Sequence, residues 1–246
     1  AGSDPQEITQ AINIINDIEL IQHVNFNLGC PSSRVQENML GLALTQNQDL
    51  VKKCLEKIME FKGDISVKCR LGLGLEEDKN YIFSYLNLFS NLGIKEVFVH
   101  CRNGVLNLDT KKNRTIPKIN YNLFLECKKN FPKLKLIPNG EIDNKETFDL
   151  LIKNDVSDFM IGRQFAKDLT FLEKLSIYKI QDKQISIGKF FKDIKDYKFL
   201  NLNLIKKSLF TILTNIPNAK NVRNNISKFQ DIDSLEEYFV DSKIWN

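Results

Sequence analysis

The sequence predicts an α/β fold: a (β/α)8 TIM-type barrel that lacks its first strands in this chain, followed by a small C-terminal all-α domain. Two observations predict this fold class. Short runs rich in Val, Ile and Phe alternate with amphipathic runs over residues 1–178, as expected for parallel strands covered by helices. From residue 179 the alternation stops, and the remaining runs have helical periodicity.

The predicted elements follow one another in a regular order. Asp4 can cap a first helix that has Pro5 at its first position. The run QHVNFNLG, residues 22–29, predicts a strand because its apolar residues alternate with polar ones. The same reasoning predicts helices over residues 47–61, 81–93, 121–131 and 145–155, and strands over residues 64–72, 95–102, 133–140 and 157–163.

The C-terminal region is predicted to be helical. Residues 202–228 predict two amphipathic helices joined at Ile216, Pro217 and Asn218, and residues 234–239 predict a third helix. We therefore expect two domains, a partial barrel over residues 1–178 and a helical domain over residues 179–246.

A doubly wound sheet and a (β/α)8 barrel both fit the alternation of strands and helices. Polar residues at the ends of successive strands favour the barrel, because barrels build their active sites at the carboxyl ends of their strands. The predicted strands are too few to close a barrel, so we expect that the sequence lacks an N-terminal portion with three further strands. The polar residues are Asn27 and Cys30, Lys68 and Arg70, His100 and Arg102, Asn139 and Gly140, and Gly162 and Arg163.

Charge is distributed unevenly along the chain, whose net charge is +4. Residues 1–178 carry 23 basic and 23 acidic side chains, whereas residues 179–246 carry 12 and 8. The basic excess of the helical region fits either a solvated lysine-rich face or a surface that binds phosphate backbones.

The composition argues against several classes of protein. Five widely spaced cysteines without a CxxC pair fit a reducing compartment better than a disulfide framework. Only two histidines are present, so we expect no metal site. No apolar run is long enough to span a bilayer, so we expect no membrane partner. We expect a monomer in the cytoplasm, or in an organelle if a transit peptide is missing from this chain.

Cys30 is the candidate catalytic residue of the site. A lone cysteine is more often a core residue than a reagent. Here Pro31 follows at once and ends the strand, which would place the thiol at the barrel mouth. Asn27 stands one pleat earlier and could hydrogen-bond a planar substrate. These surroundings favour a functional thiol over a core one.

Other candidates follow the next strands. Lys68 lies in an otherwise apolar strand, where a lysine is costly unless it meets an anion or a polar ligand. A lone histidine is often structural, but His100 stands two residues before Arg102, which favours a ligand site.

Two glycine turns and a basic loop complete the set. Asn139 with Gly140, and Gly162 with Arg163, are typical of turns that cradle a phosphate with main-chain N–H groups. Residues 111–114, KKNR, form a basic run that by itself would be ordinary solvated surface.

Several stretches together resemble the tRNA-dihydrouridine synthase family, and most of all its A-type branch. The GCPS stretch, the KxNRxIP loop and the IPxA helix turn are specific in combination, whereas NGxI and GR occur in many flavin barrels. The similar stretches, in the order of the family, are NFNLGCPSSRVQ, ISVKCRLG, VFVHCRNG, KKNRTIPKINY, FPKLKLIPNGEI, FMIGRQF and NIPNAKNVRNNIS.

The resemblance implies an FMN-dependent barrel with a helical tRNA-binding domain, which reduces a D-loop uridine with NADPH as electron donor. Cys30 would be the catalytic acid and Asn27 a neighbouring base contact. By the same resemblance, Arg102, Lys111, Lys112 and Arg114 would bind the substrate, and Lys68, His100, Asn139, Gly140, Gly162 and Arg163 would bind the flavin.

The sequence departs from the family pattern in two places. The opening segment of the family, with three strands and further flavin contacts, has no counterpart, so we expect weak FMN binding by this chain alone. Glu141 stands where the A-type branch usually has a second glycine. Sister branches carry acids there, so we expect Glu141 to be tolerated.

Two other functions remain open from the sequence. One is an FMN barrel oxidoreductase that acts on a small molecule, which the basic helical region disfavours. The other is a non-catalytic tRNA-binding protein, which the presence of Cys30, Asn27, Lys68 and His100 disfavours.

Overall fold

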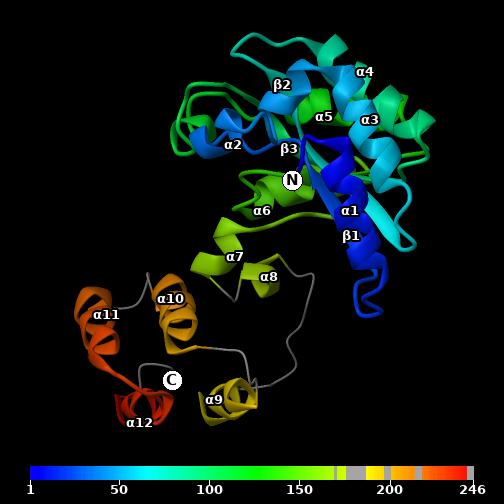
Figure 1. Cartoon of the computed structure of the whole chain (residues 1–246). Coiled ribbons are helices and arrows are strands. Elements are labelled where there is room, and N and C mark those ends of the chain that lie inside the picture. Colours follow the sequence, from blue (N-terminus) through cyan, green and yellow to red (C-terminus); the bar gives the residue numbers. More distant parts are fainter. Residues whose placement is uncertain (169–170, 176–186, 197–200, 214–217, 243–246) are drawn as a thin grey trace. The chain divides into compact units, whose positions relative to one another are not determined.

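A computed structural model describes residues 1–168, 171–175, 187–196, 201–213 and 218–242 of the chain (Figure 1). The chain divides into two compact units. The first contains Ala1–Ile142 and Asp149–Met160, and the second contains Asp143–Phe148 and Ile161–Asn246.

The first unit is built on a parallel sheet of four strands in the order β1-β2-β3-β4. These strands confirm the first four that the alternating pattern predicts. Because the strands are parallel and follow chain order, right-handed crossovers place the connecting helices on one face of the sheet. The strands are β1 (His23–Asn27), β2 (Asp64–Leu73), β3 (Glu96–Gly104) and β4 (Lys135–Asn139).

The fifth predicted strand, residues 157–163, is wrong in extent. Only Met160 pairs with the sheet, through a single parallel bridge to Asn139. A ladder needs repeated pairing along the chain, and here helix α7 (Arg163–Lys167) already begins three residues after the bridge. The segment therefore touches the sheet edge without extending it.

Side-chain caps fix where the helices of the first unit begin. Asp4 accepts hydrogen bonds from two main-chain N–H groups of α1, as predicted. Asn47, Asp78 and Asn120 cap α3, α4 and α5 in the same way. Gly93 follows α4 with φ of +82°, a conformation that suits glycine at a helix end. The helices are α1 (Pro5–Asn16), α2 (Ser33–Glu37), η1 (Ala43–Gln46), α3 (Gln48–Ile58), α4 (Lys79–Asn91), η2 (Lys112–Arg114) and α5 (Tyr121–Asn130). Helix α6 (Lys145–Lys153) has residues in both units.

The core of the first unit lies between the sheet and its helices. α4 contacts β2, and α5 contacts both β3 and β4. The strands contribute Val67 and Val99 to this core, and the helices contribute Leu86, Phe89 and Phe124, all of them fully buried. Burial of such side chains contributes about 1.5–3 kcal/mol each.

The second unit is helical where it is described. Helices occupy the three predicted positions within residues 202–242, although Ile216 and Pro217 of the predicted junction lie outside the described residues. The helices are α7 (Arg163–Lys167), α8 (Phe171–Lys174), α9 (Ile187–Lys195), α10 (Leu202–Ile212), α11 (Ala219–Lys228) and α12 (Ile232–Ser242).

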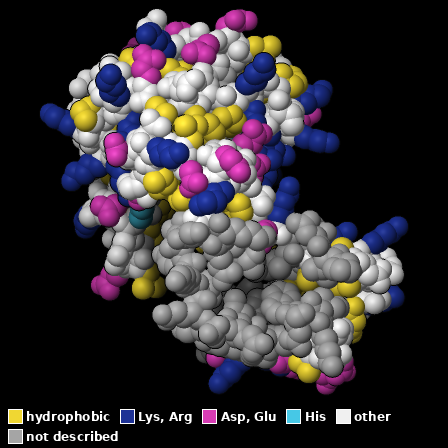
Figure 2. All heavy atoms as spheres, turned by 180° about the vertical axis from the view of Figure 1, so that it is seen from behind, with side chains coloured by type: hydrophobic (Ala, Val, Ile, Leu, Met, Phe, Trp, Pro, Cys, Tyr) yellow, Lys and Arg dark blue, Asp and Glu magenta, His cyan; other side chains and the backbone are white. Residues whose placement is uncertain are grey.

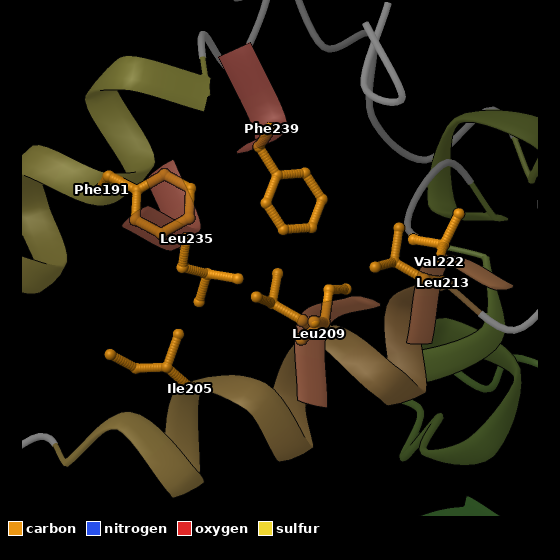
Figure 3. Packing of buried hydrophobic residues seen from close by; sticks show 8 residues of the cluster. Phe191, Ile205, Leu209, Leu213, Val222, Leu235 and Phe239 are labelled. Carbon is orange, nitrogen blue, oxygen red and sulfur yellow. The ribbon is translucent and has the colours of Figure 1, made fainter. Parts of the chain in front are cut away.

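The second unit has its own apolar core (Figure 3). Side chains from α9, α10, α11 and α12 meet there, so these amphipathic helices bury their apolar faces against each other. The cluster consists of Phe191, Ile205, Leu209, Leu213, Val222, Ile226, Leu235 and Phe239.

Candidate functional site

The strand register gathers the predicted polar residues on one face of the sheet. Asn27 is aligned with Lys68, and His100 is aligned with both Arg70 and Asn139. Lys68 and Arg70 are two residues apart in β2, so their side chains leave the same face. The five residues therefore belong to one polar face at the carboxyl ends of the strands.

The alternate residues of the same strands face the helices. Cys69 is 4% exposed and Cys101 is fully buried, as expected for side chains that alternate with the polar face along their strands. Burial raises the pKa of the Cys69 thiol to about 12 and also raises the pKa of Cys101. Such thiols stay protonated and enclosed, so they are poor reagents.

Cys30 is the only one of the five cysteines that is not buried, and all five lie in the described part of the chain. Its Sγ lies 3.5 Å from Ser32 Oγ. Its main-chain oxygen accepts a hydrogen bond from Leu42 N at 3.0 Å. The thiol is half-buried at the end of β1, where the sequence predicts it.

Two neighbours shape the turn that carries Cys30. Asn27 Oδ1 accepts a hydrogen bond from Gly29 N at 3.0 Å, so this amide already holds the turn. A Cβ at Gly41, which has φ of +56°, would lie 2.8 Å from Cys30 O and 3.2 Å from Cys30 Cβ. Glycine at position 41 therefore allows the next loop to close over the cysteine.

Lys68 is half-buried on the polar face, with no ion-pair partner among the residues that the structure describes. Burial lowers the pKa of its ammonium, and the nearby Arg70 lowers it further. A cation in this position fits an anionic or electron-rich ligand, which would offset the cost of burial.

His100 and Gly140 lie against each other at the ends of β3 and β4. His100 is 9% exposed. A Cβ at Gly140 would come within 3.1 Å of His100 Nε2, and the φ of +112° at this position also requires glycine. Tyr121 Oη donates a hydrogen bond to Gly140 O, which fixes the turn.

Asn139 is engaged with the chain beyond β4. Its Nδ2 donates a hydrogen bond to Met160 O at 2.7 Å. In addition, Met160 N donates to Pro138 O at 3.0 Å. Asn139 therefore ties the short bridge at Met160 to the end of β4.

Arg102 is 3% exposed and is held by two partners. Its guanidinium donates to Pro117 O and forms an ion pair with Glu141. Glu141 has φ of +49°, in the left-handed region that favours glycine. Glu141 thus stands where the backbone conformation favours glycine. It forms an ion pair with Arg102 that the sequence did not predict.

The basic loop, residues 105–118, is organised around Asn113. This side chain is fully buried, and its Nδ2 donates to Val105 O, Leu108 O and Asp109 O. Its Oδ1 accepts from Val105 N at 2.8 Å.

The predicted cations of the basic loop flank this anchor. Lys111 and Lys112 are exposed and Arg114 is half-buried. The family resemblance assigned Lys111, Lys112 and Arg114 to the substrate, and the role of Asn113 was missed. An asparagine inside a run of cations is the signal that could have revealed it.

Gly162 and Arg163 are exposed at the start of α7, in the second unit. The φ of Gly162 is −109°, and a Cβ there would meet nothing within 4 Å. The described residues therefore give no steric reason for glycine at this position. That these two residues form one phosphate site with Asn139 and Gly140 stays a prediction.

A surface cavity of about 680 Å³ borders the basic loop, and none of the predicted site residues is among its lining residues. It is lined by residues of α2 and η1 and by the segment Leu106, Asn107, Leu108 and Asp109. The lining includes the carboxylates of Glu37 and Asp109 and no lysine or arginine, which disfavours a phosphate ligand.

Two lysines of the second unit are already engaged by other residues of the chain. Lys195 forms ion pairs with Asp233 and Glu236, which raise its pKa. Lys206 Nζ donates to Ser227 O and Phe229 O, at the end of α11. Such contacts satisfy helix carbonyls and make Lys206 a structural residue.

Surface charge in the first unit is mixed. Figure 2 shows Lys and Arg side chains interspersed with Asp and Glu over the visible face of this unit, not gathered in a patch of one sign. In the described residues no helix is long and apolar enough to cross a membrane. The same residues contain no group of three or more His, Cys, Asp or Glu side chains suited to a metal ion.

Comparison with known proteins gives a consistent result. The family model described as dihydrouridine synthase matches residues 1–242. The tRNA-dihydrouridine(20/20a) synthase of Escherichia coli (strain K12) is 31% identical over 166 residues, which are 66% of this chain and 48% of that protein. The proteins of the same name are 30% identical over 173 residues in Pasteurella multocida (70% and 52%) and 32% over 166 residues in Synechocystis sp. (66% and 48%). The chain spans about half the length of the curated relatives it matches.

Proposed function

Because the chain belongs to the dihydrouridine synthase family, we propose that it takes part in the reduction of a D-loop uridine to 5,6-dihydrouridine in tRNA. The observation that carries this proposal is the placement of Cys30. The one cysteine outside the core stands at the end of β1, beside a polar face that carries Asn27, Lys68 and His100. A reducible base needs this combination of a proton donor and fixed polar groups.

The fold belongs to the same proposal. Four parallel strands in chain order form an arc of a (β/α)8 barrel, and the polar face is its interior. The helices described within residues 179–246 would belong to the tRNA-binding domain. The activity is that of a flavin-dependent oxidoreductase, which works in the cytoplasm where tRNA is modified.

FMN is the proposed cofactor, with NADPH as electron donor. The described residues fit such a group, because Lys68 is a half-buried cation without an ion-pair partner among them. When bound, the flavin supplies hydride to the base. Lys68, His100, Asn139 and Gly140 would hold it, with Gly162 and Arg163 at its phosphate.

Cys30 would act as the general acid of the reaction. Uracil is a conjugated enone, so addition of hydride at carbon six leaves negative charge at carbon five and at the carbonyl oxygen. The Cys30 thiol donates its proton to carbon five, and the sulfur keeps the electron pair. Asn27 would hold the polar edge of the base, so that the carbon faces the thiol.

The tRNA would be held mainly through its phosphates. Lys111, Lys112 and Arg114 present cations from the basic loop, and Arg102 lies beneath it. Exposed cations of the helical unit, such as Lys220, would also contact tRNA phosphates. Extrusion of the target uridine costs a few kcal/mol, which these contacts would offset.

The test is a cysteine variant of the full-length enzyme. Cys30→Ala should bind flavin and tRNA normally, while dihydrouridine formation, measured by mass spectrometry of digested tRNA, falls about a hundredfold or more. Cys127→Ala is the matched control, because it removes a buried thiol and should retain activity. Normal dihydrouridine yield from Cys30→Ala would refute the proposed role.

A further inference from the structure

Arg70 donates hydrogen bonds to the main chain of three segments. Its Nε donates to Gly29 O at 2.8 Å, and its Nη1 donates to Asn103 O at 2.8 Å and to Asn113 O at 3.3 Å. Gly29 immediately precedes Cys30, whereas the other two acceptors lie in β3 and at the centre of the basic loop. One planar side chain therefore connects the turn of residues 29–31, called here the cysteine turn, to two neighbouring segments.

The guanidinium is buried without a carboxylate. Arg70 is 6% exposed, and in the described part of the chain no acid forms an ion pair with it. Burial, and next the charge of Arg102, lower its pKa to about 10, so the group remains charged at neutral pH. Main-chain oxygens provide the compensation, through charge-assisted hydrogen bonds with fixed geometry.

Two glycines lie close to the Arg70 side chain and restrict where it can pack. A Cβ at Gly104 would lie 2.7 Å from Arg70 Cδ, and a Cβ at Gly29 would lie 3.5 Å from Arg70 Cγ and 3.3 Å from the carbonyl carbon of Cys69. A larger residue at position 104 would displace Leu42 or the stem of the arginine, whereas one at position 29 would only contact the stem. Its packing therefore fixes where the guanidinium stands before any ligand arrives.

The cysteine turn needs such an anchor because the strand ladder ends just before it. The pairing of β1 with β2 stops at Asn27, and Leu28 N donates to Lys68 O at 2.7 Å. Beyond that point, the contacts from Asn27 Oδ1 to Gly29 N and from Leu42 N to Cys30 O hold the chain. Arg70 supplies the bond to the Gly29 carbonyl.

We propose that Arg70 is a positioning residue, which fixes the turn of residues 29–31 and thereby places the Cys30 thiol relative to Asn27 and Lys68. The planar guanidinium matters because its N–H donors reach the Gly29 and Asn103 carbonyl oxygens at the same time with fixed geometry. Lysine and methionine lack such a group. The effect on turnover rests on the proposed function, whereas the effect on the turn follows from the contacts alone.

The test compares Arg70→Lys and Arg70→Met with Arg34→Met, a change at an exposed arginine of α2. Hydrogen exchange, read by mass spectrometry on the full chain, should rise about tenfold in the peptide covering residues 28–42 for both Arg70 variants. Exchange in the β2 and β3 core should stay near that of the parent. Arg34→Met should leave both regions unchanged.

Kinetics of the flavin-loaded full-length enzyme give the second readout. Arg70→Lys should lower kcat about tenfold while KM for tRNA changes less than about threefold, because a displaced thiol affects the chemical step. A melting temperature near that of the parent separates this effect from loss of fold. Should Arg70→Met not fold, Arg70→Lys still carries the test.

Unchanged exchange in residues 28–42 of folded Arg70→Lys would overturn the proposal, whatever the enzyme does. An equal loss of exchange protection throughout the sheet would also overturn it, because Arg70 would then be a general stabilising residue. Absence of dihydrouridine formation by the parent protein would instead count against the proposed function and leave the exchange result decisive for the turn.

Discussion

At the scale of single residues, burial distinguishes groups that look alike in the sequence. Cys69 and Cys101 are enclosed by the helices that cover the sheet, whereas Cys30 is half-buried at a strand end. Lys68 and Arg70 lie two residues apart on the same face of the sheet. Arg70 donates hydrogen bonds to main-chain oxygens, whereas Lys68 has no hydrogen-bond or ion-pair partner among the described residues. Lys68 is therefore better suited than Arg70 to bind a ligand.

Lys68→Met should stabilise the ligand-free chain at neutral pH, because burial lowers the pKa of Lys68 and so makes its charged form unfavourable in the fold. In the parent chain, the free-energy penalty for burying the charged ammonium falls as the pH rises from the lowered pKa of the folded state toward the unfolded value of about 10.4. We expect a higher melting temperature for Lys68→Met at pH 7 and a smaller difference at high pH.

Lys62→Met is the control for this prediction, because Lys62 is exposed and should change the melting temperature little at either pH. A lower melting temperature for Lys68→Met at pH 7 would mean that the ammonium has a favourable partner in the folded chain.

At the scale of elements, caps and apolar alternation determine the boundaries that the sequence predicts well. Asp4, Asn47 and Asp78 begin helices within a few residues of the predicted positions, because the capping side chain satisfies main-chain N–H groups locally. The fifth strand is reduced to the bridge at Met160 because strand formation depends on a distant partner. The basic loop depends on the buried Asn113 side chain, and the main-chain oxygen of Asn113 also accepts a hydrogen bond from the distant Arg70.

Asn113→Ala should loosen the basic loop, because the buried amide forms four hydrogen bonds within it. We expect a loss of about 2 kcal/mol of stability, together with faster trypsin cleavage after Lys111, Lys112 and Arg114. Urea unfolding and timed digestion measure the two effects. Thr115→Ala, at an exposed position of the same loop, should digest like the parent.

Cations of α10 and α11 should respond differently to neutralisation. Lys206→Met should destabilise the helical unit, because Lys206 bonds the carbonyls at the end of α11. Lys220→Met should leave stability unchanged and weaken tRNA binding, with a smaller dependence of affinity on salt. Fluorescence titrations with tRNA at two salt concentrations, alongside melting curves, separate these outcomes. Equal salt dependence in Lys220→Met and the parent would exclude Lys220 from the RNA surface.

At the scale of the whole molecule, each of the two units has an apolar core among its described residues. The first unit buries Leu86 and Phe124 against its sheet, and the second buries Leu209 and Phe239 among helices. A unit with its own core can open on its own when that core is weakened.

Leu209→Ala should therefore cost about 2–5 kcal/mol in the helical unit and expose its amides to hydrogen exchange, while β2 and β3 stay protected. Leu86→Ala is the matched variant, with the opposite pattern expected. Simultaneous loss of protection in both units for either variant would show that the chain unfolds as one cooperative body. The measurement is native-state hydrogen exchange resolved by peptide.

The sequence by itself determined the order of elements, the strand ends that carry polar residues and the single cysteine followed by proline. These features depend on local periodicity, capping and turn chemistry, which neighbouring residues encode. Tertiary structure alone decided that Arg70 bonds the turn before Cys30 and that Glu141 pairs with Arg102. Burial and pairing join residues far apart in the chain, and side-chain contacts of that kind leave no periodic trace in the sequence.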